Sequence, residues 1–423
     1  MERMKKIRGI IGCIALTGLS VLACSGFKWR LEYPKSFIVS IRNDAVVDRT
    51  DAVISLTIRE IEASYPDFNP EAFIVLSGRK ETASQADDLD GDGKADTIFL
   101  IKDVEAGEGG NVTVRYAADG VIQRTYPKRT QAELSHKFGG RFVNRKYEGG
   151  EFRNVTSLRV PSEHTDHSTF IRYEGPGWES DRVGYRFYLD WRNAVDIFGK
   201  KVSDMVLQDV GLDGFDSYHE MAGWGMDILK VGESLGVGSL GMWIDGRAER
   251  VSVTDSVLCA VVSDGPIRSQ IRTRYYGWKT GSGKYDLVSD LSITAGSRMT
   301  RHDVRVNGDP PNLCTGIVKL DDTQFMSTSR PAGVWMALAT YGMQSLSGDK
   351  LGMAVLFRRT DLVEVTEDAH SHVIVLKPKE GILTYYYLAA WEQEPGGIQS
   401  EKAFLDYLNE TVQKLDAPLK VTL

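Results

Sequence analysis

Short runs of β-branched and aromatic residues recur along the N-terminal part of the chain, separated by turns rich in Asn, Asp and Gly. Runs of this length and composition, bounded by turn-forming residues, are typical of β-strands. Their spacing suits two small sheets packed on each other, so we predict a β-sandwich over residues 36–126. The predicted strands are 37–41, 52–58, 73–76, 97–101 and 112–116.

Longer alternating segments follow. In residues 267–278 and 286–306, apolar and polar side chains alternate, which is the period of a strand with one buried face. Strands of this length, with few helical interruptions, favour large antiparallel sheets packed face to face. We therefore predict a large two-sheet domain over residues 141–423, joined to the smaller domain by a polar linker at 127–140.

One helix is predicted near the C-terminus. Phe404, Leu408, Val412 and Leu415 recur at helical spacing, and Ser400 precedes them as a candidate N-cap. Elsewhere the composition, with 42 Gly against 13 Pro, suits many strands and tight turns better than a helical bundle. The sequence therefore predicts an all-β protein with few helices.

The chain begins like a secreted protein. Basic residues within 3–8 precede an apolar run at 10–23 that is too short for a permanent membrane helix. Val21-Leu22-Ala23-Cys24 resembles a bacterial lipoprotein signal, in which the cysteine is lipidated and becomes the mature N-terminus. The alternative is a simple signal peptide that contains a cysteine. We expect removal of residues 1–23, a tether at 24–35, and a periplasmic or cell-envelope protein anchored through Cys24, with the outer membrane as the expected site.

Charge and cysteine content narrow the function classes. The formal net charge is −7 at pH 7, and an acidic surface argues against non-specific nucleic-acid binding. Behind the leader, Cys259 and Cys314 remain, too few for a disulfide scaffold in a chain of this length. They form either one disulfide or two buried thiols.

The segment 88–96 carries the sharpest local motif, D-x-D-G-D-G-x-x-D. Its carboxylates would repel one another unless a hard cation neutralises them, and the glycines let the chain curl around an ion. It lacks the glutamate that closes an EF-hand loop, so we expect a structural calcium ion. The alternative is an acidic turn without an ion. The predicted ligands are Asp88, Asp90, Asp92, Asp96 and the carbonyl oxygen of Lys94.

Residues 172–230 are dense in Arg, carboxylate and aromatic side chains. In the alternating stretch 183–191, one set of side chains would be buried and the other would line a groove. Aromatic rings suit the C–H faces of sugars and guanidinium groups suit carboxylates, so we predict a site for an anionic saccharide. The alternative is a network of Arg–carboxylate pairs on a sheet surface. The predicted substrate-binding residues are Arg172, Glu174, Trp178, Arg182, Arg186, Trp191, Arg192, Trp224 and Lys230.

Four side chains of this segment are candidates for catalysis. His219 next to Glu220 is the preferred acid/base pair, because imidazole titrates near neutral pH and a carboxylate can fix its tautomer. Tyr185 is a second candidate for the base of an elimination. In a hydrolase, Glu179 and Glu220 would instead flank the scissile bond, and their separation would decide the stereochemistry.

Two glycine-rich matches lack the context that their motifs need. Residues 232–236 read G-x-S-x-G, but no helix is expected after the serine, as a nucleophile elbow requires. Residues 236–241 read G-x-G-x-x-G and continue as a strand and turn, so no helix N-terminus is expected there to hold a pyrophosphate. We therefore expect a glycine loop between strands and no organic cofactor.

Besides the Asp-rich loop, five stretches stand out: 173–186, 190–193, 196–201, 218–221 and 224–227. They resemble a family of Bacteroidetes lipoproteins known only as a domain of unknown function. The resemblance implies a galactose-mutarotase-like supersandwich for the C-terminal region and a place among polysaccharide-utilisation genes. That fold hosts mutarotases, polysaccharide lyases and parts of glycoside hydrolases, so it does not choose an activity, and the family supplies no catalytic residues.

Together these observations predict a carbohydrate-active enzyme that acts on uronate-containing, pectin-like oligosaccharides. The abundance of Arg favours a lyase that works by β-elimination, because a guanidinium group can neutralise the uronate carboxylate. A glycoside hydrolase, a non-catalytic glycan-binding lipoprotein and a sugar mutarotase or epimerase remain alternatives. The expected partner is an acidic oligosaccharide or polysaccharide, with the membrane engaged only through the lipid anchor and no nucleic acid.

Overall fold

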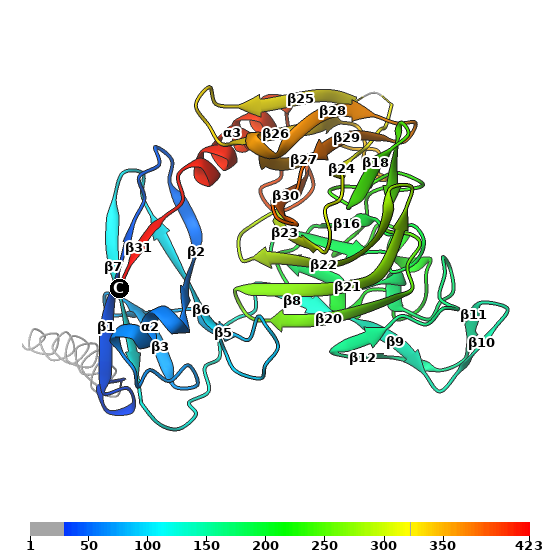
Figure 1. Ribbon diagram of the computed structural model, residues 1–423. Coiled ribbons are helices and arrows are strands. Elements are labelled where there is room, and N and C mark those ends of the chain that lie inside the picture. The colour runs from blue at the N-terminus through cyan, green and yellow to red at the C-terminus, as the bar shows by residue number, and fades with distance from the viewer. Residues whose placement is uncertain (1–28, 322) are drawn as a thin grey trace, which may run out of the picture.

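The computed structural model describes residues 29–321 and 323–423. Most elements are strands, and the longest helix lies near the C-terminus (Figure 1). The all-β prediction is therefore confirmed. The predicted leader and Cys24 lie outside the described residues. Within the described part, no helix is long and apolar enough to cross a membrane.

The N-terminal body encloses one apolar core between two sheets. Its strands are β1 (Lys35–Arg42), β2 (Arg49–Thr57), β3 (Phe73–Ser77), β4 (Lys80–Thr82), β5 (Ser84–Asp87), β6 (Thr97–Val104), β7 (Gly109–Tyr116) and β31 (Lys420–Thr422). The sheet orders are β31-β1-β7-β3-β4 and β2-β6-β5. The predicted strands fall within β1, β2, β3, β6 and β7, except that Ile58 begins helix α2 (Ile58–Ser64), where Thr57 and Glu60 form a capping box.

The end of the chain completes this N-terminal body. Strand β31 pairs antiparallel with β1, with Val421 opposite Ile41, and Val421 packs against the core. Arg49 Nη2 donates to the carbonyl oxygen of Lys414, 2.7 Å away. Strand β31 therefore belongs to the N-terminal body, although it lies within residues 141–423, which we assigned to the larger domain.

The larger body contains a nine-stranded antiparallel sheet and two five-stranded sheets. The nine strands are β13 (Ser157–Arg159), β20 (Ser256–Asp264), β21 (Arg268–Thr280), β22 (Gly283–Thr294), β23 (Met299–Val306), β30 (Ile382–Trp391), β27 (Leu351–Arg358), β26 (Trp335–Gly342) and β25 (Thr323–Ser329), in that order. One five-stranded sheet has the order β17 (Gly225–Asp227), β16 (Val195–Lys200), β15 (Val183–Phe187), β14 (Gly177–Ser180) and β8 (Thr130–Glu133). The other has the order β19 (Arg247–Arg250), β18 (Gly241–Ile244), β24 (Leu313–Val318), β29 (Ser371–Leu376) and β28 (Leu362–Glu367).

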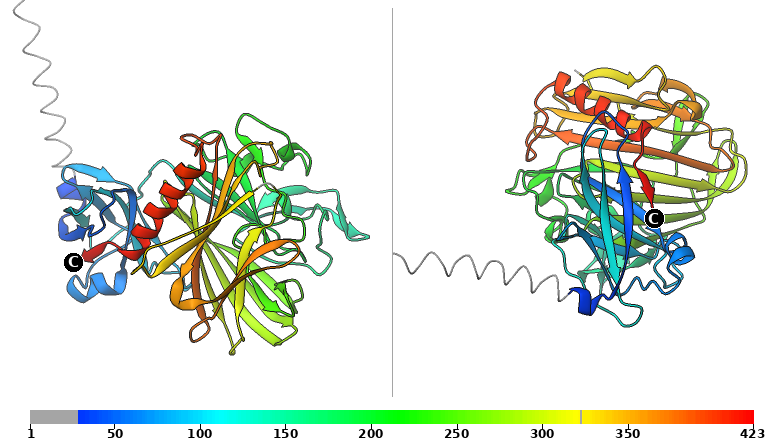
Figure 2. Two further views of the ribbon diagram at one scale, coloured as in Figure 1. Left: turned by 90° about the horizontal axis from the view of Figure 1, so that it is seen from above. Right: turned by 90° about the vertical axis from the view of Figure 1, so that its left-hand side faces the viewer.

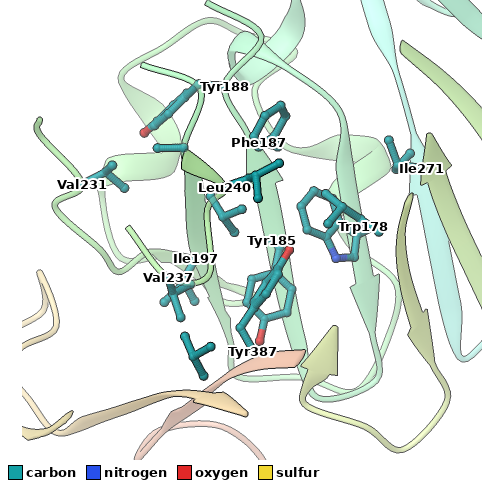
Figure 3. Packing of buried hydrophobic residues seen from close by; sticks show 14 of the residues in the cluster. Trp178, Tyr185, Phe187, Tyr188, Ile197, Val231, Val237, Leu240, Ile271 and Tyr387 are labelled. Carbon is teal, nitrogen blue, oxygen red and sulfur yellow. The ribbon is translucent and has the colours of Figure 1, made fainter. Parts of the chain in front are cut away.

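Side chains from all three sheets form one core. Figure 3 shows Trp178, Tyr185 and Tyr387 close together inside it, and the rings of Trp178 and Tyr185 are stacked with centroids 5.8 Å apart. Cys259 and Cys314 are buried free thiols, which decides between the two alternatives left open by the sequence.

Residues 127–140 are not a linker. Strand β8 pairs with β14, and all four of its residues are buried. Its polar groups find partners inside the fold: Thr130 Oγ1 donates to the carbonyl oxygen of Gly265 at 2.7 Å, and Glu133 contacts Arg172. The prediction was wrong because a polar segment looks exposed until its partners, which lie far away in the sequence, are known.

The predicted C-terminal helix is confirmed as α3 (Glu401–Asp416). Ser400 Oγ accepts from the backbone N–H of Ala403 at 3.2 Å, as an N-cap does. Phe404, Leu408 and Val412 are buried and pack on the nine-stranded sheet. Figure 2 shows α3 beside that sheet, leading into β31 of the N-terminal body.

A projecting segment, residues 135–154, extends from the larger body, away from the N-terminal body (Figure 1). We call it the arm. It consists of two antiparallel ribbons, one of β9 and β12 and one of β10 and β11. Its strands are β9 (Ser135–Phe138), β10 (Arg141–Val143), β11 (Lys146–Glu148) and β12 (Glu151–Asn154).

Candidate functional site

A buried charged cluster lies where β15, β16 and β17 run side by side. Arg186 of β15 is opposite Asp196 of β16, and Arg186 Nη2 lies 2.8 Å from Asp196 Oδ2. The same guanidinium contacts Asp227 of β17 and donates to Tyr218 Oη at 3.0 Å. All four residues are buried, and we call them the inner cluster.

Asp227 is the unusual acid of the inner cluster. Burial and the neighbouring Asp196 carboxylate raise the pKa of Asp227 well above its usual range, although the Arg186 charge opposes this. The Asp227 carboxyl is therefore easier to protonate than an exposed carboxylate, while the Arg186 guanidinium beside it favours the charged form.

His219 connects the inner cluster to solvent, and 33% of its side chain is exposed. Its Nδ1 atom lies 2.9 Å from the carbonyl oxygen of Phe215, which can only accept, so Nδ1 carries the proton. The Nε2 lone pair lies 3.5 Å from Asp227 Oδ2. Burial and the positive charge of Arg186 lower the pKa of His219, which favours the neutral imidazole that a general base requires.

A second group of charges lies nearer the surface around Arg192. Its guanidinium lies 3.1 Å from Asp166 and 2.9 Å from Glu174, and its Nε donates to Asp190 Oδ1 at 3.0 Å. The ring of Tyr188 joins the two groups, because its centroid is 3.7 Å from the Arg192 guanidinium and 4.9 Å from that of Arg186. The outer cluster is Asp166, Glu174, Asp190 and Arg192.

The backbone that carries the outer cluster is strained. Four non-glycine residues within eight positions have left-handed φ angles: His167 (56°), Thr169 (58°), Tyr173 (37°) and Glu174 (71°). The resulting turn lets the His167 N–H donate to Glu174 Oε1 at 2.8 Å. Strain of this kind persists only where the surroundings impose it, and it concentrates at functional sites.

Phe215 lies between two histidines that each face a carboxylate. Its ring centroid is 4.3 Å from that of His167 and 4.8 Å from that of His219. His167 Nδ1 lies 2.6 Å from Asp166 Oδ1, as His219 faces Asp227. Two imidazole–carboxylate pairs therefore flank one aromatic ring.

Trp178 and Tyr185, predicted to contact substrate or catalyse, belong to the core, and the predictions were wrong. Both are fully buried among the apolar side chains of Figure 3. Trp178 Nε1 donates to Thr300 Oγ1 at 2.9 Å, and Tyr185 Oη donates to the carbonyl oxygen of Arg298 at 2.6 Å. Neither can stack on a sugar or take a proton from one.

Glu179 and Arg172 are also buried and cannot contact a substrate. The Glu179 carboxylate pairs with Lys200, and both side chains are 0% exposed. Arg172 is buried against Glu133 and donates to the carbonyl oxygen of Gln208 at 2.7 Å. Buried charges need partners of opposite sign, and here those partners are inside the protein. The predicted catalytic role of Glu179 and binding role of Arg172 were wrong.

Three further predicted residues do not join the clusters. Arg182 precedes β15, at the end away from Tyr188, and donates to the carbonyl oxygen of Pro395 at 2.9 Å. Glu220 and Lys230 are exposed. The carboxylate that faces His219 is Asp227, so the predicted pairing with its sequence neighbour Glu220 was wrong.

Trp224 lines a surface cavity of about 310 Å³ together with Tyr218, Asp209 and Asp213. The lining contains no Lys or Arg. An acidic lining with an aromatic wall does not suit an anionic sugar, so the cavity does not provide the predicted arginine-rich groove.

Trp191 is the exposed aromatic residue that the prediction needs, with 43% of its surface accessible. The Arg250 guanidinium lies 5.4 Å from its ring centroid and donates to the carbonyl oxygen of Ser234 at 3.3 Å. Among the described residues, no carboxylate pairs with Arg250. The sequence analysis missed Arg250, because it is remote in the chain and follows no motif.

The Asp-rich loop brings three of its predicted ligands together. Carboxylate oxygens of Asp88, Asp90 and Asp96 lie within 4.8 Å of one another. Asp92 is not part of this group, and its Oδ1 accepts from the N–H of Lys94 at 2.8 Å. Three converging carboxylates fit a hard cation that prefers oxygen ligands.

The chain belongs to the family described as "Domain of unknown function (DUF4861)", which matches residues 41–421. The family prediction made from the sequence is thereby confirmed as far as a domain of unknown function. No curated protein matches the chain.

Among solved structures, the chain is similar to a protein in the glycosyl hydrolase family 38 from Enterococcus faecalis, with 8% identity, a TM-score of 0.43, and coverage of 95% of this chain and 50% of that one. It is also similar to an alpha-mannosidase from Enterococcus faecalis V583, with 9% identity, a TM-score of 0.37, and coverage of 92% and 46%. The chain thus spans about half the length of these proteins. Likenesses this distant carry no argument about its activity.

Proposed function

We propose that the protein is a carbohydrate-active enzyme that cleaves uronate-containing oligosaccharides by β-elimination, with His219 as the base. The observation that carries the proposal is the neutral, partly exposed imidazole of His219, held by the Phe215 carbonyl oxygen at 2.9 Å beside the buried carboxyl of Asp227. The substrate class is supported by the exposed Trp191 ring and by the guanidinium of Arg250 beside it, which forms no ion pair in the described part of the chain.

The proposed step transfers two protons and breaks the C4–O bond of the sugar. Nε2 of His219 takes the proton from C5 of the uronate, the C4–O bond breaks, and a C4–C5 double bond forms. The departing oxygen takes a proton from His167, which is paired with Asp166. The C5 proton becomes acidic only when the uronate carboxylate is neutralised. We assign this role to Arg250, because the Arg192 guanidinium already faces Asp166, Glu174 and Asp190.

A glycoside hydrolase is the second candidate, and the outer cluster favours it. Burial and the Glu174 charge raise the pKa of Asp166, whereas Arg192 and Arg186 lower the pKa of Glu174 against the effect of burial. Two carboxyl groups whose pKa values are shifted in opposite directions suit the roles of general acid and general base. Their oxygens lie within 4.8 Å, however, closer than the roughly 5 Å or more between carboxyls that flank a glycosidic bond, so elimination ranks first.

The test is incubation of the purified protein with pectic, alginate and glucuronan oligosaccharides. New ultraviolet absorbance from an unsaturated uronate is expected, together with its loss in His219→Ala and its retention in Glu220→Gln, the exposed neighbour that serves as control. New reducing ends without absorbance would replace the lyase by a hydrolase. Tight binding without product would indicate a glycan-binding lipoprotein, and faster interconversion of sugar anomers a mutarotase.

We further propose that Asp88, Asp90 and Asp96 hold a structural calcium ion. At a calcium concentration of a hundred times the dissociation constant, the free energy of unfolding should rise by about 2.7 kcal/mol. Thermal unfolding with calcium or with a chelator measures this, and the double variant Asp88→Asn/Asp96→Asn should abolish the difference. The same chelator effect in wild type and variant would contradict the site.

The expected lipid anchor is likewise a proposal, as is the galactose-mutarotase-like fold of the larger body. Its nine-stranded sheet against two smaller sheets is compatible with that fold. We propose that the protein is held at the cell envelope through lipidated Cys24. Mass spectrometry of the mature N-terminus and membrane fractionation of Cys24→Ala test this, and an unmodified Cys24 in the wild type would exclude it.

A further inference from the structure

The arm, residues 135–154, is basic in an acidic protein. It holds five Lys or Arg residues and two Glu, whereas the chain as a whole has a formal charge of −7. The hairpin tip is formed by Asn144 and Arg145, both with left-handed φ angles of 48° and 66°, as in the tight turns that close two-residue hairpins. The basic residues are Lys137, Arg141, Arg145, Lys146 and Arg153.

In the part of the chain that the structure describes, the five cations are not held in ion pairs, although Arg141 stands opposite Glu148 in the β10–β11 ribbon. Most buried arginines of the molecule do form ion pairs. Two of them lie over aromatic rings instead: Lys137 Nζ is 5.1 Å from the Phe152 centroid, and the Arg153 guanidinium is 5.7 Å from that of Phe138. Phe138 is itself 39% exposed. The two ribbons of the arm therefore carry five cations without ion pairs among the described residues, and one exposed aromatic ring.

The arm is attached directly to the strained loop of the candidate site. The backbone N–H of Tyr147 donates to the carbonyl oxygen of Ser168 at 2.7 Å, and Thr169 Oγ1 donates to the carbonyl oxygen of Tyr147 at 3.0 Å. The rings of Phe142 and Tyr147 pack on Phe170 at 5.1 and 4.9 Å. A polymer lying along the arm would therefore continue towards Asp166 and His167.

We propose that the arm binds a polymeric acidic glycan, so that the protein engages a chain of several sugars beyond those in the catalytic site. Regularly spaced uronate carboxylates would meet the guanidinium and ammonium groups, and the Phe138 ring would cover a sugar C–H face. This inference rests on the proposed function for the substrate class. An anionic membrane is the less suitable occupant, because β1, which follows the proposed tether, lies at the opposite end of the molecule from the arm (Figure 1).

Binding to polygalacturonate, measured by calorimetry at two salt concentrations, tests the arm. The variant Arg141→Gln/Arg145→Gln/Lys146→Gln removes three exposed charges that form no ion pair within residues 29–321 and 323–423, so the fold should be retained. We expect about tenfold weaker binding and a weaker salt dependence, since partly screened charge contacts are lost. The matched control, Arg59→Gln/Arg79→Gln/Lys80→Gln, removes three exposed charges from the N-terminal body and should bind as the wild type does.

Equal polymer affinity for the arm variant, the control and the wild type would overturn the inference. So would binding of the wild type, but not of the arm variant, to phosphatidylglycerol vesicles when polygalacturonate does not bind. The measurements are made in a His219→Ala background and need no turnover. Polymer binding through the arm, with no product from the wild type, would therefore reject the proposed enzymatic activity and support the binding role of the arm. Turnover of short oligosaccharides without arm-dependent polymer binding would support the enzymatic activity and reject the binding role of the arm.

Discussion

His219 Nε2 faces Asp227 Oδ2 at 3.5 Å, although the two residues lie on different elements and His219 has Glu220 beside it in sequence. The contact arises because β17 places Asp227 next to Arg186 of β15 inside the sheet, while the turn at 217–219 brings the imidazole over it. The partly exposed imidazole of His219 thereby lies against the buried carboxyl of Asp227. This arrangement is what gives the site an acid/base function to test.

Replacing Asp227 by Asn should lower kcat by about a hundredfold or more, with little change in KM. The imidazolium formed in the proposed step would lose its acidic partner, and positioned proton transfer contributes about 10²–10⁴ in rate. Arg186 keeps Asp196, 2.8 Å away, so the variant should fold. Steady-state kinetics measures kcat and KM, and circular dichroism shows whether the variant is folded. An unchanged kcat would remove Asp227 from the mechanism, and Asp209→Asn, at the exposed cavity, is the control.

The pH dependence of kcat/KM should show an acid limb below pH 6.5. Burial and Arg186 lower the pKa of His219 from 6.5, and the base works only when neutral. Activity should therefore be full at pH 7 and fall as pH drops through the lowered pKa. A limb centred above pH 7 would mean that another group is the base.

Stability should fall between pH 6.5 and 4 because of His302. This imidazole is buried, with Nε2 2.7 Å from Ser289 Oγ, and burial lowers its pKa from 6.5 to about 4. The unfolded chain takes up the proton first, so the contribution is intact above pH 6.5 and is lost as pH falls towards 4, by about 3 kcal/mol. Urea unfolding at a series of pH values measures this.

The variant His302→Gln controls for the carboxylates that titrate nearby. It should be less stable than the wild type at pH 7, yet lose less stability on acidification. Parallel curves for the two proteins would contradict the assignment to His302.

Lys200→Met should destabilise the fold by about 3–5 kcal/mol, because it leaves the Glu179 carboxylate buried without a counter-charge. Both side chains are 0% exposed. The double variant Lys200→Met/Glu179→Gln should recover much of this loss. Urea unfolding measures both free energies. Activity retained in the folded double variant would agree with a structural role for Glu179, and a catalytically dead one would restore the original prediction.

Arg250→Gln should raise KM for acidic oligosaccharides about tenfold, because the substrate would lose a charge-assisted hydrogen bond. The free energy of unfolding should stay nearly unchanged, because no carboxylate among the described residues is left without its ion-pair partner. Trp191→Ala should act in the same direction. Arg247→Gln is the control, since Arg247 lies in the same hairpin and is paired with Glu249, 3.0 Å away. Equal KM values for all four proteins would show that substrate binds elsewhere.

Local patterns in the sequence predicted the elements well. The run at 97–101 became the first five residues of β6, and Phe404, Leu408 and Val412 became the buried face of α3. These predictions succeeded because the alternation of polar and apolar residues is set by strand and helix geometry, which depends on neighbours in the chain. The same reasoning failed for β8, whose polar residues are buried because their partners lie elsewhere.

The candidate site was predictable only as a region. Composition located residues 172–230, and His219 within them, but it could not separate Arg186, which is satisfied by Asp196 and Asp227, from Arg250, which has no carboxylate partner. The aromatic residues divided in the same way: Trp178 fills the core, whereas Trp191 faces solvent. The difference lies in which long-range partner each side chain meets, and residue type does not contain that information.

By itself the sequence determined an all-β protein with one C-terminal helix, an Asp-rich loop and a region dense in charges and rings, since these follow from periodicity and local chemistry. Only the tertiary structure decided that β31 closes the N-terminal body, that the arginines of the sheet are neutralised inside it, and that Asp227 is the partner of His219. Burial and charge pairing are properties of contacts between remote segments, and those contacts exist only once the chain has folded.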